Sequence, residues 1–287
     1  MITLDVNAIE NRQLYSFLTS ALIPRPIALV STIDKNGNVN LSPFSYFNCV
    51  STRPPILMIA PVKKARDGEE KDTFLNLQET AECVINLTNY SMVEQMSLTS
   101  APFERGINEF KKAGFTEEKS LLVKPPRVKE SPVAFECKVT QIIELAKNGG
   151  AGNVIFCEIL SIHVAEDVMD KNGNIDPYKL DTVARLGGNL YSRVSPSSIF
   201  ELQKPISAIG VGVDNIPDRL LKLGHFSGNE LARLASIEAV PSKTEISKFP
   251  ALLDGMKVKN EKELLLYMSE LLSFNQVKEA WLVGLNL

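Results

Sequence analysis

The sequence predicts a mainly β fold with inserted helices (α+β), most simply a small barrel, followed by a largely helical C-terminal extension. Two observations support this prediction. Between residues 27 and 167, apolar runs rich in Val, Ile and Phe alternate with turns that contain Asn, Gly or Pro, which is typical of antiparallel strands. After Tyr191 the pattern changes to prolines and to apolar residues at helical spacing. We therefore expect a β domain over residues 1–195 and a mixed, mostly helical extension over residues 196–287.

The first expected element is a short amphipathic helix over residues 9–22, which Pro24 and Pro26 end. Its apolar face consists of Leu14, Phe17, Leu18 and Leu22. A hairpin follows, with strands on either side of Asp34-Lys35-Asn36-Gly37. Because Asn-Gly tolerates positive φ angles, we expect a type I′ turn there.

Further strands are expected at residues 54–62, 83–88, 132–146 and 153–167, the last two joined by a glycine-rich loop. Short helices are expected at residues 73–81, 91–99 and 106–113. Ser91 and Glu94 have the spacing of a capping box, as do Ser227 and Glu230 in the extension. A later amphipathic helix carries Leu264, Met268, Leu271 and Leu272 on one face.

The overall charge balance argues against several classes of function, although a local charged patch stays compatible with it. The chain has 31 Lys and Arg against 34 Asp and Glu, a formal charge of −3, which gives no field to attract nucleic acid or an anionic membrane. No window approaches 18 consecutive apolar residues, and the first residues lack a basic stretch followed by an apolar one. We expect a cytoplasmic protein with no nucleic-acid or membrane partner.

Cysteine and histidine are scarce. The four cysteines, Cys49, Cys83, Cys137 and Cys157, form no CxxC pair, and we interpret them as small buried residues of a reduced protein rather than as disulfide or zinc residues. The two histidines, His163 and His225, are too few for most metal or acid-base constellations. We therefore expect no metal site.

Two common motifs are rejected. The segment DKNGN, at residues 34–38 and 170–174, places Asp and Asn at alternate positions, but neither copy continues with the Gly and Glu of an EF-hand loop. Both copies are better interpreted as turns. Gly210-Val211-Gly212 lacks the third glycine of a dinucleotide fingerprint, since Asn215 stands in its place.

Two segments remain as candidates for binding. Residues 63–73 form a charged loop that leads into a helix, where free backbone N–H groups, Lys71 and the Thr73 hydroxyl are suited to a phosphate. A solvated loop with a simple N-cap is the alternative. Residues 40–48 interleave small polar groups with aromatic rings, which suits the edge and face of a flat heterocycle. A half-buried strand with an edge proline is the alternative there.

Together the two segments indicate one ligand with a phosphate at one end and an aromatic ring system at the other. Residues 20–195 resemble the flavin reductase-like family of FMN-binding split barrels. The resemblance rests on Pro24–Thr32, Gly37, Asn40, Ser42–Phe47, Val50-Ser51, Pro54-Pro55, Lys71-Asp72-Thr73, Asn76, Phe110, Ala113–Phe115, Pro126–Val128, Glu130–Pro132, Glu136-Cys137 and His163. The segments around Gly210, Gly228 and Glu238 are similar to the extension of a longer subgroup, for which we assign no role.

The resemblance implies FMN in a groove near a homodimer interface. The implied residues at the isoalloxazine edge are Asn40, Leu41, Ser42 and Pro43, and those along the ring and ribityl chain are Ser45, Tyr46, Phe47 and Asn48. Lys71 and Thr73 are implied at the phosphate, with Asp72 in a capping or ribityl-hydroxyl role. Arg185 and Gly188, with Tyr191, resemble a terminal motif that approaches the flavin, although a plain C-cap fits them nearly as well.

The implied activity is an FMN oxidoreductase that receives hydride from NADH or NADPH. This step needs positioning more than acid-base groups, because the cofactor carries the reactive centre. An oxygenase or another electron acceptor is the implied partner. An FMN-binding electron carrier or sensor without NAD(P)H turnover is the alternative, and a partner-docking role for residues 196–287 is a third.

Overall fold

The computed structural model describes residues 1–64, 68–202, 204, 209–248 and 260–287. The chain divides into two compact units, Met1–Phe200 and Glu201–Leu287. The division lies close to the boundary expected after residue 195. Each unit has its own core and is described by itself.

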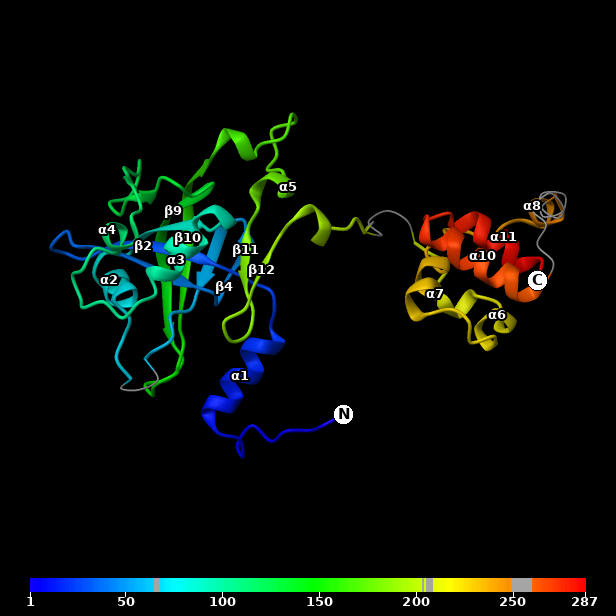
Figure 1. Ribbon diagram of the computed structural model, residues 1–287, viewed down its shortest axis with the longest axis horizontal. Helices are drawn as coiled ribbons and strands as arrows, with labels where there is room; N and C mark the ends of the chain where they lie inside the picture. Colours follow the sequence, from blue (N-terminus) through cyan, green and yellow to red (C-terminus); the bar gives the residue numbers. More distant parts are fainter. Residues whose placement is uncertain (65–67, 203, 205–208, 249–259) are drawn as a thin grey trace. The chain divides into compact units, whose positions relative to one another are not determined.

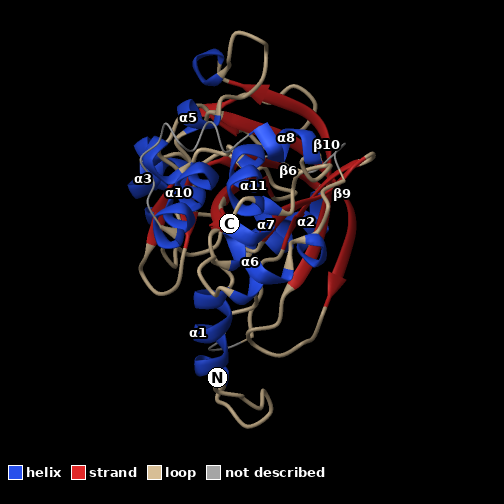
Figure 2. Ribbon diagram, turned by 90° about the vertical axis from the view of Figure 1, so that its right-hand side faces the viewer, coloured by secondary structure: helices blue, strands red, loops and turns tan. Residues whose placement is uncertain are grey.

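The first unit is built on a seven-stranded antiparallel sheet in the order β3-β2-β6-β9-β10-β5-β4. Its strands are β2 (Ala28–Ile33), β3 (Val39–Phe44), β4 (Phe47–Thr52), β5 (Pro55–Ile59), β6 (Glu82–Leu87), β9 (Val133–Glu144) and β10 (Asn153–Val164). The two longest strands, β9 and β10, form a hairpin that runs through the unit (Figure 1 and Figure 2). The predicted mainly β fold with inserted helices is confirmed.

Two small sheets complete the strands. One joins β1 (Arg25–Pro26), β11 (Val183–Arg185) and β12 (Tyr191–Arg193), and the other joins β7 (Glu117–Glu118) and β8 (Arg127–Val128). The first of these ties the start of the barrel to the segment after residue 183, although the two are far apart in sequence.

The turn between β2 and β3 differs from the type I′ turn that the sequence predicts. Only Gly37 has a positive φ, of 88°, whereas a type I′ turn needs two such residues. The Asp34 carboxylate accepts hydrogen bonds from the backbone N–H groups of Asn36 and Asn38 and therefore stabilises a longer loop. Asp170 makes the same bonds to Asn172 and Asn174, so both DKNGN segments are turns, as predicted.

The helices of the first unit are α1 (Asn11–Ala21), α2 (Asp72–Thr80), α3 (Val93–Leu98), α4 (Glu109–Ala113) and α5 (Pro177–Leu180), with 3₁₀ turns at Tyr90–Met92, Glu166–Val168 and Pro196–Ser198. Helix α4 begins later than residue 106 because the Asn108 side chain caps it by accepting from Phe110 and Lys111 N–H. The capping box expected from Ser91 and Glu94 is absent. Ser91 Oγ donates to Asn89 Oδ1 instead, and α3 starts at Val93.

Strand β2 is buried on both faces. Ala28 and Val30 face a core that α2 covers with Phe74 and Leu77. Leu29 faces a second core built with β3, α3 and α4. This double burial explains the continuous apolar run in β2, since a strand with one wet face would alternate.

The cysteines are free thiols, but they are not all buried as expected. Cys83, Cys137 and Cys157 lie in the core on β6, β9 and β10, with 3.9 Å between the sulfur atoms of Cys83 and Cys157. Cys49 is exposed, because β4 is an edge strand whose residues after Phe47 are exposed or half-buried. The prediction of burial is wrong at this position.

The second unit is helical. Its helices are α6 (Asp218–Lys222), α7 (Gly228–Leu234), α8 (Lys243–Lys248), α10 (Glu261–Ser273) and α11 (Val277–Leu285), with a 3₁₀ turn at Val213–Asn215. The Ser227–Glu230 capping box is confirmed. Trp281 lies in the core and donates from Nε1 to the Leu234 carbonyl over 2.8 Å. Gly210 packs against the backbone of Ala235 and Ser236, so this glycine has a packing role.

In the part of the chain that the structure describes, no helix has both the length and the apolar character needed to cross a membrane.

Candidate functional site

Two adjoining hollows open on the first unit, with volumes of about 970 Å³ and about 350 Å³. The larger lies between β3, the start of α2 and the loop after α3. The smaller lies between α1, the β3–β4 connection and the segment after β5. Both are lined by Ser42, Lys64, Lys71 and Ser100, so they meet along a common edge.

The structure brings the two candidate binding segments together at these hollows. The predicted residues that line the larger hollow are Asn40, Ser42, Lys71, Asp72 and Thr73. Those that line the smaller are Ser42, Pro43, Ser45, Tyr46 and Lys71. One groove is therefore bordered by the start of α2, with the Lys71 cation, and by the end of β3, with the Tyr46 ring after it.

Three predicted residues of the strand segment do not line either hollow. The side chains of Leu41 and Phe47 are buried in the two cores. Asn48 is exposed, and its Oδ1 accepts from the Cys49 backbone N–H over 2.8 Å. Leu41 nevertheless has a role near the site through its backbone, as described below.

Arg185 and Gly188 also lie outside the lining of both hollows. The Arg185 guanidinium packs over the Tyr191 ring, 4.5 Å from its centre. Arg25 links this turn to α1, because its guanidinium donates to the carbonyls of Leu186 (3.0 Å), Thr19 (2.6 Å) and Leu22 (2.6 Å). The turn is thus held beside the helix whose Tyr15 and Thr19 line the smaller hollow.

Asn40 is the centre of a buried hydrogen-bond network at the larger hollow. Its Nδ2 donates to Glu109 Oε1 over 3.0 Å, and Glu109 Oε2 accepts from the Leu41 backbone N–H over 2.9 Å. The Thr73 hydroxyl donates to Asn40 Oδ1 over 2.8 Å. These bonds fix the start of α2 against β3 and α4. They also engage the hydroxyl hydrogen that the sequence analysis expected at a phosphate.

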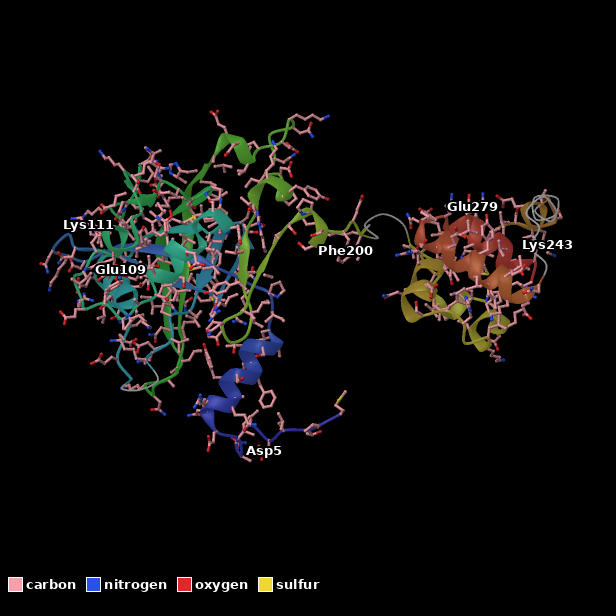
Figure 3. All side chains as sticks on the ribbon, viewed as in Figure 1. Asp5, Glu109, Lys111, Phe200, Lys243 and Glu279 are labelled. Carbon is pink, nitrogen blue, oxygen red and sulfur yellow. The ribbon has the colours of Figure 1, made fainter. Side chains whose placement is uncertain are left out.

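Glu109 is buried, being 5% exposed, and Figure 3 labels it among the side chains of the first unit. Burial raises the pKa of Glu109, and the hydrogen bond from Leu41 N–H offsets part of this rise. Both carboxylate oxygens have donors, so Glu109 holds the local structure together. Sequence reasoning missed it because its partners on β3 are 68 and 69 residues away.

The charges around the hollows are mostly paired. The buried Lys63 ammonium lies 2.7 Å from Glu70 Oε1, and Lys64 lies 2.8 Å from Glu69 Oε2. Arg105, also missed from sequence, pairs with Asp72 over 3.1 Å. Lys71 is exposed at the N-cap of α2 and has no ion-pair partner among the described residues. Its ammonium is therefore available to an anionic ligand.

Neither histidine lines the hollows. His163 Nε2 lies 2.7 Å from Glu136 Oε1 on the neighbouring strand β9. His225 lies in the second unit, 3.3 Å from Ser269 Oγ. Among the described residues, no group of three or more His, Cys, Asp or Glu side chains is arranged to hold a metal ion.

Comparison with known proteins agrees with this arrangement. Residues 20–179 match the flavin reductase like domain family. An uncharacterized protein of Aquifex aeolicus is 40% identical over 186 residues, which are 65% of this chain and 92% of that protein.

Two solved structures are similar in fold and sequence. Nitrilotriacetate monooxygenase component B from Bacillus cereus is 32% identical, with a TM-score of 0.66 over 70% of this chain and 98% of that one. A flavin reductase with a split barrel domain from Shewanella frigidimarina is 30% identical, with a TM-score of 0.59 over 69% and 95%. The fold is therefore a flavin reductase-type split barrel. The chain belongs to the flavin reductase-like family.

The residues at the two hollows fit a flavin mononucleotide. The Lys71 ammonium and the first turn of α2, which has no side-chain cap, offer charge and N–H donors to a phosphate. Pro43, Ser45 and Tyr46 offer apolar surface and polar edges to a flat ring.

Proposed function

We propose that this protein is an FMN-dependent oxidoreductase that takes hydride from NADH or NADPH. The observation that carries the proposal is the meeting of the two hollows at Ser42, Lys64, Lys71 and Ser100. A cationic helix start and an aromatic strand edge thereby border one groove, and membership of the flavin reductase-like family supports a flavin as its ligand.

In this proposal, Lys71 and the first N–H groups of α2 hold the phosphate. Asn40 and Ser42 lie between the two ends, and Pro43, Ser45 and Tyr46 border the ring. Thr73 acts chiefly by bonding Asn40, because its hydroxyl hydrogen is engaged there. The turn that contains Arg185 and Gly188 is held beside α1, because Arg25 donates to the carbonyls of Leu186 and Thr19.

Bound FMN supplies the hydride-accepting centre. The chain has to position FMN and the nicotinamide nucleotide, and it has to hold the walls of the groove in place. The Asn40–Glu109–Leu41 network holds β3 in place, and the Lys63–Glu70 pair holds the loop before α2. The absence of histidine from the lining is consistent with a step that depends on positioning.

We also propose that the protein is a homodimer. The apolar face of α1 is exposed, with Phe17 at 45%, Leu18 at 46% and Leu22 at 62%. Such a face on a helix is typical of a protein interface. Because Tyr15 and Thr19 of the same helix line the smaller hollow, a second copy seated on α1 would border the flavin site.

The downstream acceptor is part of the proposal. One similar structure is named as component B of a monooxygenase, and we propose an oxygenase or another electron acceptor as the partner here. The four free thiols are consistent with a reducing, cytoplasmic environment.

The first test is the visible spectrum of the purified protein and its change on anaerobic addition of NADH or NADPH. A flavin spectrum that bleaches on mixing supports the oxidoreductase. A flavin spectrum that does not change with either nucleotide supports the alternative, an electron carrier or sensor. A protein that has no affinity for FMN contradicts both.

A further inference from the structure

Asp72 presents a difficulty for a phosphate at the start of α2. Its carboxylate belongs to the first residue of the helix, next to Lys71 at the N-cap. A carboxylate there stabilises the helix, but it also repels a phosphate that approaches the same N–H groups. The first unit must offset this charge if the groove is to hold FMN.

Of the four other carboxylates that line the larger hollow, three have partners of their own. Glu70 pairs with the buried Lys63, Glu69 pairs with Lys64, and Glu109 accepts from Asn40 and Leu41. Glu104 is exposed on the loop after α3. Asp72 differs from these four because it lies on the first residue of α2, directly next to Lys71.

Arg105 is placed to neutralise it. Its Nη1 lies 3.1 Å from Asp72 Oδ1, and its Nη2 donates to Asn76 Oδ1 over 3.1 Å and lies 3.7 Å from Glu79 Oε1. The guanidinium, which comes from the loop between α3 and α4, thus contacts three residues of α2. Asn76 is held in turn, because its Nδ2 donates to Thr32 Oγ1 over 3.1 Å.

The Arg105–Asp72 pair contributes little to folding. The side chains are 40% and 29% exposed, and water screens the attraction in pairs as exposed as this. Its effect bears on the ligand, because an unpaired Asp72 carboxylate would repel a phosphate bound at the same helix start.

We propose that Arg105 is a positioning residue that makes the start of α2 able to bind a phosphate by cancelling the charge of Asp72. This inference rests on the proposed FMN function. It assigns the preference for the phosphorylated flavin to the Arg105–Asp72 pair. Without Arg105, the Asp72 carboxylate would repel the phosphate.

The test compares FMN with riboflavin, which has the same ring and ribityl chain but no phosphate. Affinities are measured by quenching of flavin fluorescence for the wild type, Arg105→Gln, Asp72→Asn and the double variant. We expect Arg105→Gln to weaken FMN about tenfold or more and riboflavin less than about twofold. In the double variant, FMN affinity should return to within about threefold of the wild type.

The control is the Arg193–Asp181 pair, which has a 2.6 Å contact and lies outside both hollows. Arg193→Gln should leave the affinity ratio of the two flavins unchanged.

Equal losses for FMN and riboflavin in Arg105→Gln would show a merely structural role and overturn the inference. A double variant as weak as Arg105→Gln would also overturn it, because Arg105 would then act on the phosphate directly. A wild type that binds neither flavin overturns the proposed function itself, whereas a wild type that binds FMN and fails either comparison overturns only this inference.

Discussion

The Glu109 network gives the sharpest prediction on the architecture of the site. The change Glu109→Gln keeps the side-chain shape but replaces one acceptor oxygen with an NH₂ group. One of the two donors that now face the carboxylate, Asn40 Nδ2 or the Leu41 N–H, then loses its acceptor in a buried place. An unsatisfied buried donor costs about 1–3 kcal/mol, so we expect the free energy of unfolding of the first unit to fall by about that amount.

The assay is urea unfolding followed by two signals. Far-UV circular dichroism reports both units, whereas the single tryptophan, Trp281, lies in the core of the second unit and reports only that unit. With an m-value of about 2 kcal/mol/M, the loss corresponds to a downward shift of about 0.5–1.5 M in the transition of the first unit. The tryptophan transition should not move. The exposed residue Glu94 gives the control, since Glu94→Gln should change stability by less than about 0.5 kcal/mol.

A first-unit transition within about 0.2 M of the wild type would refute the reasoning, because it would mean that the carboxylate does not hold β3 in place. A shift of the Trp281 signal by the same amount as the dichroism signal would also refute it, since the two units would then unfold as one.

Three further predictions follow from the first unit. Burial raises the pKa of Glu136, but hydrogen bonds from the backbone N–H groups of Leu121 and Leu122 and from His163 outweigh this effect and hold the pKa below its ordinary value of 4.5. Glu136 therefore stabilises the fold above pH 4.5, and this contribution is lost as the pH falls below that value. In urea unfolding, the stability difference between the wild type and Glu136→Gln should shrink below pH 4.5, and a constant difference would contradict the assignment. Phe17→Asp on α1 should convert a dimer into a monomer in sedimentation velocity, while a monomeric wild type would contradict the proposed interface. A thiol-reactive dye should label Cys49 alone in the folded protein and all four cysteines in denaturant; rapid labelling of the core cysteines in the native state would be inconsistent with their burial.

Much of the fold could be predicted from local patterns. The strands of the main sheet follow apolar runs between turn residues, and the Ser227–Glu230 capping box was visible as a spacing. The sequence predicts the position of the turn after β2 correctly, but the predicted type I′ geometry is wrong. The alternation of residues cannot show that the Asp34 carboxylate would accept two backbone N–H groups and lengthen the loop.

The site was less accessible to sequence reasoning. Lys71 and Tyr46 could be proposed from their local setting, and both line the groove. Glu109 and Arg105 could not, because they act through partners on β3 and α2 that are distant in the chain. In a short helix or loop, such charged residues look like ordinary solvated side chains. The exposed face of α1 was predicted as an apolar face, but the pattern alone does not say what covers it.

The central claim is that the groove holds FMN and that NADH or NADPH reduces it there. The most direct measurement is anaerobic stopped-flow absorbance of the FMN-loaded protein mixed with each nucleotide. We predict loss of the oxidised flavin absorbance, at a rate that rises with nucleotide concentration and saturates. An absorbance that stays constant with both nucleotides, in a protein that binds FMN, would contradict the claim.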